Sequence, residues 1–136
     1  MPAAAAQSAD GAVDNAPRRV IAIVDDDARL SSSLRRLLEA ADFATETYDS
    51  AEAFLARDDA RRLSCILLDV HMPGMSGLEL LGRLRATGSK VQVLMLTAID
   101  DAVTRRQALS LGCAAFLSKP IAGRMLIDSI RTATGV

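Results

Sequence analysis

The stretch CILLDVHMPGMSGLEL, residues 65–80, decides the fold that we expect for this chain. It opens with the apolar run 65–68, which has the length and composition of a buried strand. The carboxylate of Asp69 follows directly, and then comes a turn rich in proline and glycine. Ser76 with Glu79 three residues later is the pattern of a capping box at a helix start. In α/β sheets ligand sites lie at the carboxyl ends of strands, so we expect Asp69 at such a site.

The same succession of strand and helix recurs along the chain. Apolar runs rich in β-branched or aromatic residues predict strands at 19–24, 43–48, 63–68, 91–96 and 114–117. Helical spacing predicts one helix after Asp27, one after Ser50, and three more at 76–86, 100–111 and 122–133. The alternation predicts an α/β fold: a doubly wound, five-stranded parallel sheet with five helices and right-handed crossovers.

Apolar spacing also predicts which helical side chains face the sheet. They are Leu30, Leu34, Leu37, Leu38 and Ala41 in the first helix; Ala53, Phe54 and Leu55 in the second; Leu78, Leu81 and Leu84 in the third; Val103 and Leu109 in the fourth; and Met125, Leu126 and Ile130 in the fifth.

Length and composition limit the domain organisation and the partners. The chain has 136 residues, which is enough for one domain. Its net charge of −1 predicts no bulk attraction to nucleic acid. Residues 1–18 are small, polar and without apolar periodicity, which predicts a disordered leader before a domain at 19–136. We expect no membrane span, no bound nucleic acid and no output domain within the chain. Cys65 and Cys113 lack metal-ligand spacing, so we expect buried, reduced thiols and a cytoplasmic protein.

Polar residues follow four of the predicted strands. Asp25 and Asp26 end the first, Asp69 the third, Thr97 the fourth and Lys119 the fifth. Each residue alone is compatible with an ordinary turn, helix cap or surface position. Strand ends of a parallel sheet share one edge, however, so together they predict a site.

The chemistry of this set points to a phosphoryl group. If the first and third strands are neighbours, three carboxylates converge, and a divalent cation would offset their repulsion. Oxygen ligands without a His or Cys cluster favour a hard ion, Mg²⁺ (or Mn²⁺) before Ca²⁺. With a lysine and a hydroxyl nearby, Asp69 could act as the nucleophile of aspartyl-phosphate chemistry.

The sequence also resembles the receiver domains of bacterial two-component response regulators, the CheY-like family. The resemblance covers roughly residues 19–133 and rests on four motifs in order. These are the acidic pair Asp25-Asp26, the run Asp-x-x-Met-Pro-x-x-x-Gly from Asp69 to Gly77, Thr97-Ala98, and Lys119-Pro120. The runs 51–55 and 115–120 look most like receivers of LuxR- or FixJ-type regulators. The family implies a flavodoxin-like sheet with strand order 2-1-3-4-5.

The resemblance implies a role for each matching residue. Asp69 would be the phosphoacceptor. Asp25, Asp26, Asp69 and the backbone carbonyl of His71 would hold the metal. Thr97 and Lys119 would bind phosphoryl oxygens. Phe116 would be an aromatic switch that turns inward when Thr97 moves, and the peptide bond before Pro120 would be cis.

The function expected on these grounds is a phosphoacceptor switch in a phosphorelay. A sensor histidine kinase or phosphotransfer protein would donate to Asp69. The surface formed by 100–111, 114–117 and 122–133 would then meet a partner or a second copy; a homodimer through the first and last helices is the other arrangement. The domain would assist its own phosphorylation and dephosphorylation without being a turnover enzyme. Two alternatives stay open: a receiver that binds proteins independently of phosphorylation, and a phosphohydrolase with an Asp nucleophile. A hydrolase would typically carry a second carboxylate where His71 stands.

Overall fold

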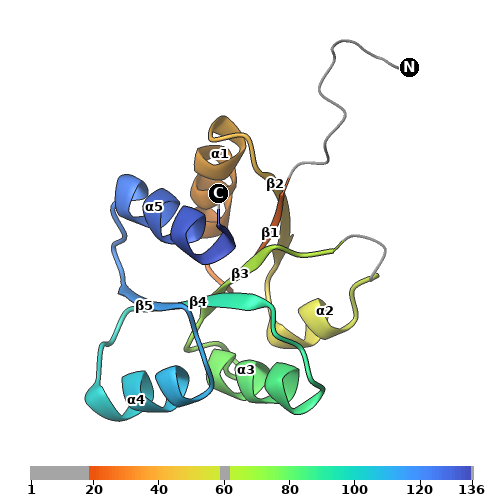
Figure 1. The fold of residues 1–136 in the computed structure, drawn as a ribbon, viewed down its shortest axis with the longest axis vertical. Helices are drawn as coiled ribbons and strands as arrows, with labels where there is room; N and C mark the ends of the chain where they lie inside the picture. The colour runs from red at the N-terminus through yellow and green to blue at the C-terminus, as the bar shows by residue number, and fades with distance from the viewer. Residues whose placement is uncertain (1–18, 59–61, 136) are drawn as a thin grey trace.

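The computed structural model describes residues 19–58 and 62–135, which form a five-stranded parallel sheet with helices on both faces (Figure 1). The elements, in chain order, are β1 (Val20–Val24), α1 (Ala28–Ala40), β2 (Ala44–Tyr48), α2 (Ala51–Leu55), β3 (Cys65–Asp69), α3 (Gly77–Ala86), β4 (Gln92–Thr97), α4 (Ala102–Ser110), β5 (Ala115–Ser118) and α5 (Gly123–Thr134). The strand order β2-β1-β3-β4-β5 confirms the expected doubly wound topology.

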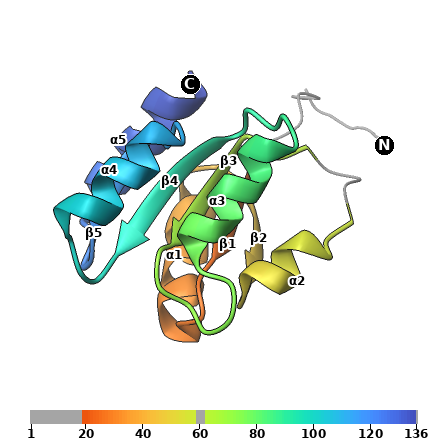
Figure 2. The ribbon, with the colours of Figure 1, turned by 90° about the horizontal axis from the view of Figure 1, so that it is seen from below.

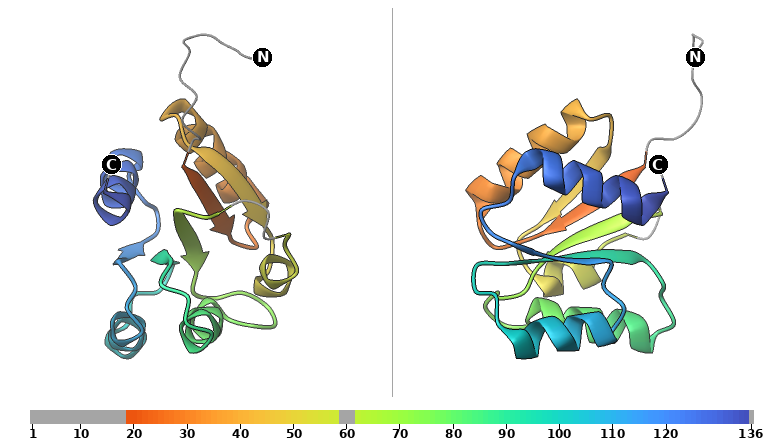
Figure 3. Two further views of the ribbon diagram at one scale, coloured as in Figure 1. Left: turned by 45° about the vertical axis from the view of Figure 1, so that its right-hand side comes forward. Right: turned by 60° about the vertical axis from the view of Figure 1, so that its left-hand side comes forward.

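The helices form two layers around the sheet. α1 and α5 lie on one side, and α2, α3 and α4 lie on the other (Figures 1 and 3). On the side that carries α2, α3 and α4, helix α3 runs beside α4 (Figure 2). Each layer buries its own aliphatic cluster against one face of the sheet, so β1 and β3 are buried on both faces. Continuous apolar runs such as VIAIV and CILL are what a strand covered on both faces requires.

Side-chain caps set where four of the helices begin; the sequence predicted those of α1, α2 and α3, and Asp101 caps α4 by accepting the Thr104 N–H at 2.8 Å. Asp27 caps α1 by accepting the Leu30 N–H, and Ser50 caps α2. At α3 the capping box is complete, with Ser76 and Glu79 each accepting the other's backbone N–H. The start of the helix within 65–80 is therefore fixed by local interactions.

Pairing within the sheet places Asp69 inside β3. We expected this strand at 63–68, but its ladder begins at Cys65, opposite Ile21 on one side and Gln92 on the other, and extends to Asp69 opposite Leu96. Leu63 still packs on the core, outside the ladder. The carboxylate thus belongs to the last ladder residue of β3, which pairs with β4, while the preceding residues of the strand pair with both β1 and β4.

Four side chains expected in the core lie on the surface instead. Their exposed fractions are 42% for Leu55, 57% for Val103, 52% for Leu109 and 57% for Met125. α4 enters the core only through the small Ala108, with Leu111 just beyond its end, so its larger side chains stay outside. On α5, Leu126, Ile127 and Ile130 share one face at spacings of three and four, and Met125 points away from it.

Several other expectations can be compared with the described residues. Cys65 and Cys113 are buried and free, as expected. Among the described residues, no helix is both long and apolar enough to cross a membrane. The leader proposed for residues 1–18 lies outside the described residues, so it stays a prediction.

Candidate functional site

Three charged side chains converge at the carboxyl edge of the sheet. Asp25 follows β1, Asp69 ends β3 and Lys119 follows β5. The ammonium nitrogen of Lys119 lies 2.9 Å from Asp25 Oδ2 and 3.2 Å from Asp69 Oδ1. These contacts join residues up to 94 positions apart, so only the strand order brings them together. The place is where the order reverses between β1 and β3, the position at which open α/β sheets bind ligands.

Asp25 is the most enclosed member of the group. Only 2% of the residue is exposed, and its Oδ1 accepts the backbone N–H of Asp27 at 2.9 Å. Its own N–H donates to the Tyr48 carbonyl at 3.0 Å, which ties it to the end of β2. Backbone contacts from both sides therefore fix the orientation of this carboxylate.

The charges of the group do not balance. Burial raises the pKa of Asp69, and the charge of Asp25 raises it further; Lys119 and the backbone N–H of His71 oppose this rise. For Lys119, burial would lower the pKa, but the hydrogen bond and charge of Asp25, together with Asp69, raise it above its usual range. The lysine therefore stays charged, since it faces two carboxylates, whereas Asp69 faces one cation and one like charge.

The acidic group has the composition of a site for a hard divalent cation. Asp25, Asp26 and Asp69 each offer one carboxylate oxygen, and these oxygens all lie within 4.8 Å of one another. Asp26 is exposed while the other two are buried, so the group opens to solvent on one side. Oxygen donors alone suit Mg²⁺ or Mn²⁺, and one cation would offset the excess negative charge described above.

Gly77 allows α3 to begin against the backbone of Asp69. A Cβ at this position would lie 2.0 Å from the Asp69 carbonyl oxygen and 3.1 Å from the Cα of Val70. The Gly77 N–H donates to the Val70 carbonyl at 2.9 Å, which closes the turn. The glycine of the Asp-x-x-Met-Pro-x-x-x-Gly run is therefore required for close backbone approach.

Glu52 of α2 holds the middle of the same turn. Its Oε2 accepts the Met75 N–H at 3.0 Å, and this hydrogen bond lowers the pKa of Glu52. Gly74 has a φ of +77°, and a Cβ there would meet Glu52 Oε2 at 2.7 Å. Glu52 thus fixes the turn that contains His71, whose side chain is exposed.

Thr97 lies at the same edge, but its hydroxyl is not directed at the charged group. The residue is fully buried, and its Oγ1 donates to the Ile99 carbonyl at 2.6 Å and accepts the Ile99 N–H at 3.1 Å. Within the described part of the chain the Thr97 hydroxyl makes no hydrogen bond to Asp69 or Lys119, although the Thr97 backbone carbonyl accepts the Lys119 N–H at 2.7 Å.

Phe116 is already inward in this conformation. It is 8% exposed and stands opposite Met95 in the sheet. The peptide bond between Lys119 and Pro120 is cis, as the resemblance implied.

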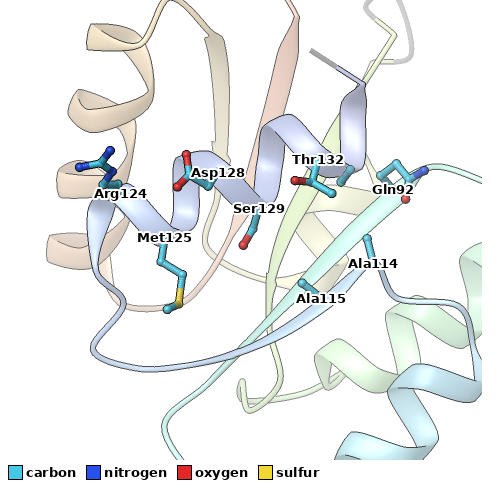
Figure 4. A pocket seen from close by; sticks show the side chains of 9 residues that line it. Gln92, Ala114, Ala115, Arg124, Met125, Asp128, Ser129 and Thr132 are labelled. Atoms are coloured by element: carbon cyan, nitrogen blue, oxygen red, sulfur yellow. The ribbon is translucent and has the colours of Figure 1, made fainter.

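A groove of about 710 Å³ lies away from this edge, between α5 and the beginnings of β4 and β5 (Figure 4). Gln92, Ala114 and Ala115 form its sheet side, facing Met125 and Asp128 of α5. It lacks a converging set of charged groups, so the carboxyl edge of the sheet is the better candidate site.

The sequence pattern predicted that Asp25, Asp26, Asp69, Thr97 and Lys119 lie at one edge of the sheet, and the structure places them there; the roles predicted for these residues stay predictions. Sequence reasoning missed Glu52, because a glutamate in the first turn of a short helix carries no signal of a contact 23 residues away. It noted Gly77 as part of a motif without its reason, which only the path of the backbone reveals.

Comparison with known proteins gives a consistent result. A family model described as "Response regulator receiver domain" matches residues 21–131. The transcriptional regulatory protein FixJ of Azorhizobium caulinodans is 39% identical over 113 residues, covering 83% of this chain and 54% of FixJ. FixJ of Bradyrhizobium diazoefficiens is 37% identical, covering 83% and 55% respectively. The chain thus spans about half the length of these curated relatives.

Solved structures agree with the sequence comparison. The crystal structure of FixJ-N superposes with a TM-score of 0.79 at 31% identity, covering 88% of this chain and 96% of FixJ-N. A response regulator receiver protein from Burkholderia phymatum gives a TM-score of 0.77 at 37% identity, covering 88% and 97%. A CheY-like receiver domain protein from Methanospirillum hungatei JF-1 gives 0.82 at 26% identity, covering 88% and 95%.

Proposed function

This chain belongs to the response regulator receiver domain family of two-component systems, and we propose that Asp69 accepts a phosphoryl group from a sensor histidine kinase or a phosphotransfer protein. The observation that carries the proposal is the contact of Lys119 with Asp69 and Asp25, at 3.2 and 2.9 Å, beside a third carboxylate. A carboxylate nucleophile next to a fixed cation suits transfer of a negatively charged phosphoryl group better than it suits any neutral substrate.

The transfer is a single displacement at phosphorus. One carboxylate oxygen of Asp69 attacks the phosphorus of a phosphohistidine; the new O–P bond forms as the N–P bond breaks, and its electron pair returns to the imidazole nitrogen. Lys119 is already held within reach of Asp69 and neutralises charge on the phosphoryl oxygens. The Thr97 hydroxyl would turn from Ile99 to a phosphoryl oxygen after transfer.

The metal belongs to the same proposal. Asp25, Asp26, Asp69 and the backbone carbonyl of His71 would hold Mg²⁺ or Mn²⁺. When bound, the ion would supply positive charge at the phosphoryl oxygens. The turn fixed by Glu52 and Gly77 keeps the His71 backbone beside the end of β3.

The response to phosphorylation would be a change in what the surface of α4, β5 and α5 binds. Ile99, Val103, Leu109 and Met125 leave large apolar side chains exposed on α4, just before it, and on α5. Large apolar side chains exposed on these elements are candidates for contact with a partner. We propose that this surface meets a partner or a second copy; α1 with α5 is the other pair of elements that could form a homodimer. Two free, buried thiols support a cytoplasmic location.

Intact-mass measurement tests this function. The chain is incubated with acetyl phosphate and Mg²⁺, and separately with a phosphorylated histidine donor. We expect an adduct of one phosphoryl group that hydrolyses slowly, that is absent in Asp69→Asn, and that a chelator prevents. The exposed acid Asp128, changed to Asn, is the matched control and should leave the adduct unchanged.

The same measurement separates the two alternatives. Steady release of phosphate from a small phosphate ester, without an accumulating adduct, would indicate a hydrolase. Absence of an adduct with every donor, while partner binding persists, would indicate a phosphorylation-independent binding domain. In the proposed function the domain assists its own phosphorylation and dephosphorylation and does not turn over a separate substrate.

A further inference from the structure

The loop between β4 and α4 keeps the hydroxyl of Thr97 occupied. Ile99 contributes both partners, a carbonyl at 2.6 Å and an N–H at 3.1 Å. A hydroxyl has one proton to donate, so it cannot donate to a phosphoryl oxygen on Asp69 while it donates to Ile99. Whatever fixes the position of Ile99 therefore controls the direction of this hydroxyl.

Asp100, the next residue, ties this loop to two other elements. Its carboxylate receives a two-pronged contact from the Arg105 guanidinium of α4, with Nε 3.3 Å from Oδ1 and Nη2 in contact with Oδ2. The Ser118 hydroxyl at the end of β5 donates to Asp100 Oδ2 at 3.3 Å. Asp100 thus fastens the loop to α4 and to the residue directly before Lys119.

Arg105 also covers the ring of Phe116. The central carbon of its guanidinium lies 4.9 Å from the ring centroid, in cation–π geometry. The ring is otherwise enclosed by the core cluster of α2, α3 and α4. One arginine therefore contacts both the loop that holds Thr97 and the inward-facing ring of Phe116.

We propose that Asp100 and Arg105 form a latch that holds the resting conformation, with the Thr97 hydroxyl on Ile99 and the Phe116 ring beneath Arg105. The latch opens when Asp69 is phosphorylated, because the phosphoryl oxygen competes for the Thr97 hydroxyl and Ile99 is then released. Arg105 acts on the reaction through Thr97 and is a positioning residue. This inference rests on the proposed function of Asp69.

The exposure of the latch suits a device that must open. The Arg105 and Asp100 side chains are 42% and 39% exposed, and exposed ion pairs are weak. Together with one cation–π contact, the pair is expected to shift a two-state equilibrium by roughly two- to tenfold. A shift of this size biases the resting state without blocking phosphorylation.

The first test needs no phosphate. Hydrogen exchange of the Ile99 amide, measured by NMR, reports directly on the hydrogen bond to Thr97. We expect exchange to quicken by roughly two- to tenfold in Arg105→Ala and in Asp100→Ala. The neighbouring exposed arginine provides the matched control, and Arg106→Ala should exchange as the wild type does. Equal exchange in Arg105→Ala and Arg106→Ala would overturn the latch.

The second test measures the rate of adduct formation with acetyl phosphate and Mg²⁺. Arg105→Ala should react a few times faster than both the wild type and Arg106→Ala. In a Thr97→Ala background the same substitution should have no effect, because the hydroxyl that the latch restrains is gone. A gain that persists without Thr97 would contradict the latch, since it would arise by another route.

The two tests fail separately. If the wild type forms no adduct, the proposed function of Asp69 is wrong, and the amide exchange still decides whether the latch exists. If the wild type forms the adduct but exchange is the same in Arg105→Ala and Arg106→Ala, only the latch is wrong.

Discussion

A group of charged side chains and a single arginine lie at opposite ends of the same sheet, and their charges are paired to very different degrees. At the carboxyl edge, Asp25 and Asp69 share one cation, Lys119, in a buried setting. At the other end, the guanidinium of Arg85 donates to four backbone carbonyls around the starts of β4 and β5. These are Leu111 at 2.8 Å, Val91 at 3.0 Å, Ser89 at 3.2 Å and Gly112 at 3.2 Å.

The two ends of the sheet differ in how completely their charges are paired. Arg85 satisfies carbonyls where α3 and α4 end and the chain turns toward a strand, so its charge is well solvated by dipoles and stabilises the fold. The carboxylates keep an excess negative charge, which opposes folding unless a cation arrives. The Arg85 end of the sheet therefore stabilises the fold. The carboxyl edge carries a repulsion between carboxylates that a bound cation would reduce.

Asp69→Asn should have the largest effect, and in opposite directions for activity and stability. The adduct should be lost completely. The melting temperature should rise by a few degrees, because the raised pKa of Asp69 means that its ionisation opposes folding at neutral pH. The gain should shrink as the pH falls through that pKa, where the wild-type carboxyl is already protonated. A melting temperature of Asp69→Asn below that of the wild type at neutral pH would contradict the claim that the ionised Asp69 carboxylate opposes folding.

Lys119→Met should reveal the cost of the two carboxylates directly. Removing the cation leaves Asp25 and Asp69 buried and uncompensated, so we expect a loss of about 3 kcal/mol in the free energy of unfolding. The exposed Lys90, changed to Met, is the control and should stay within about 0.5 kcal/mol of wild type. Urea unfolding measures both, and the loss should be smaller in an Asp69→Asn background.

Gly77→Ala should damage the carboxyl edge through the backbone. The new Cβ would collide with the Asp69 carbonyl at 2.0 Å, which we expect to cost about 3 kcal/mol and to slow adduct formation. Gly82 of the same helix is the control, since a Cβ there meets nothing within 4 Å. Gly82→Ala should stabilise the domain by about 0.5 to 1 kcal/mol. Equal effects at the two glycines would refute the close-approach argument.

Arg85→Ala tests the other end of the sheet. Losing the contacts to four carbonyls should cost about 2 kcal/mol in urea unfolding. Adduct formation at 25 °C should be unchanged, because the hydrogen bonds of Arg85 among the described residues all lie at the other end of the sheet. Arg83→Ala, an exposed arginine two residues earlier, should be nearly neutral. A marked loss of phosphorylation in folded Arg85→Ala would show that the two ends are coupled.

Glu52→Gln should have the smallest effect, and it should depend on pH. Because the Met75 N–H lowers the pKa of Glu52, its charge stabilises the fold above the ordinary carboxyl pKa, and this stabilisation is lost as the pH falls through the lowered value. The variant should therefore melt slightly below wild type at pH 7 and match it in acid. Mg²⁺ affinity, measured by calorimetry, should also fall. A difference that stays the same at every pH would mean that the charge of Glu52 plays no part.

Much of this fold can be predicted from the sequence because the interactions that define its helices and strands are local. Strand runs, capping residues and the alternation of elements follow from neighbours within a few positions. The positions of Asp25, Asp69 and Lys119 at strand ends follow as well, once the sheet is taken to be parallel. Which helical side chains face the core was less predictable: Val103, Leu109 and Met125 lie outside, because α4 packs through Ala108 and α5 through Ile127.

By itself, therefore, the sequence determined the order of elements and the chemical groups available at each strand end. Only the tertiary structure decided the contacts between distant segments: Glu52 with the turn after β3, Arg85 with four carbonyls, and Arg105 above Phe116 between Asp100 and the core. The physical reason is the sequence separation over which each kind of interaction acts. Local hydrogen bonds and hydrophobic periodicity act over a few residues and leave a pattern in the sequence. A contact between distant elements depends on how the helices pack on the sheet. A charged residue on a helix therefore carries no signal in the sequence that identifies its distant partner.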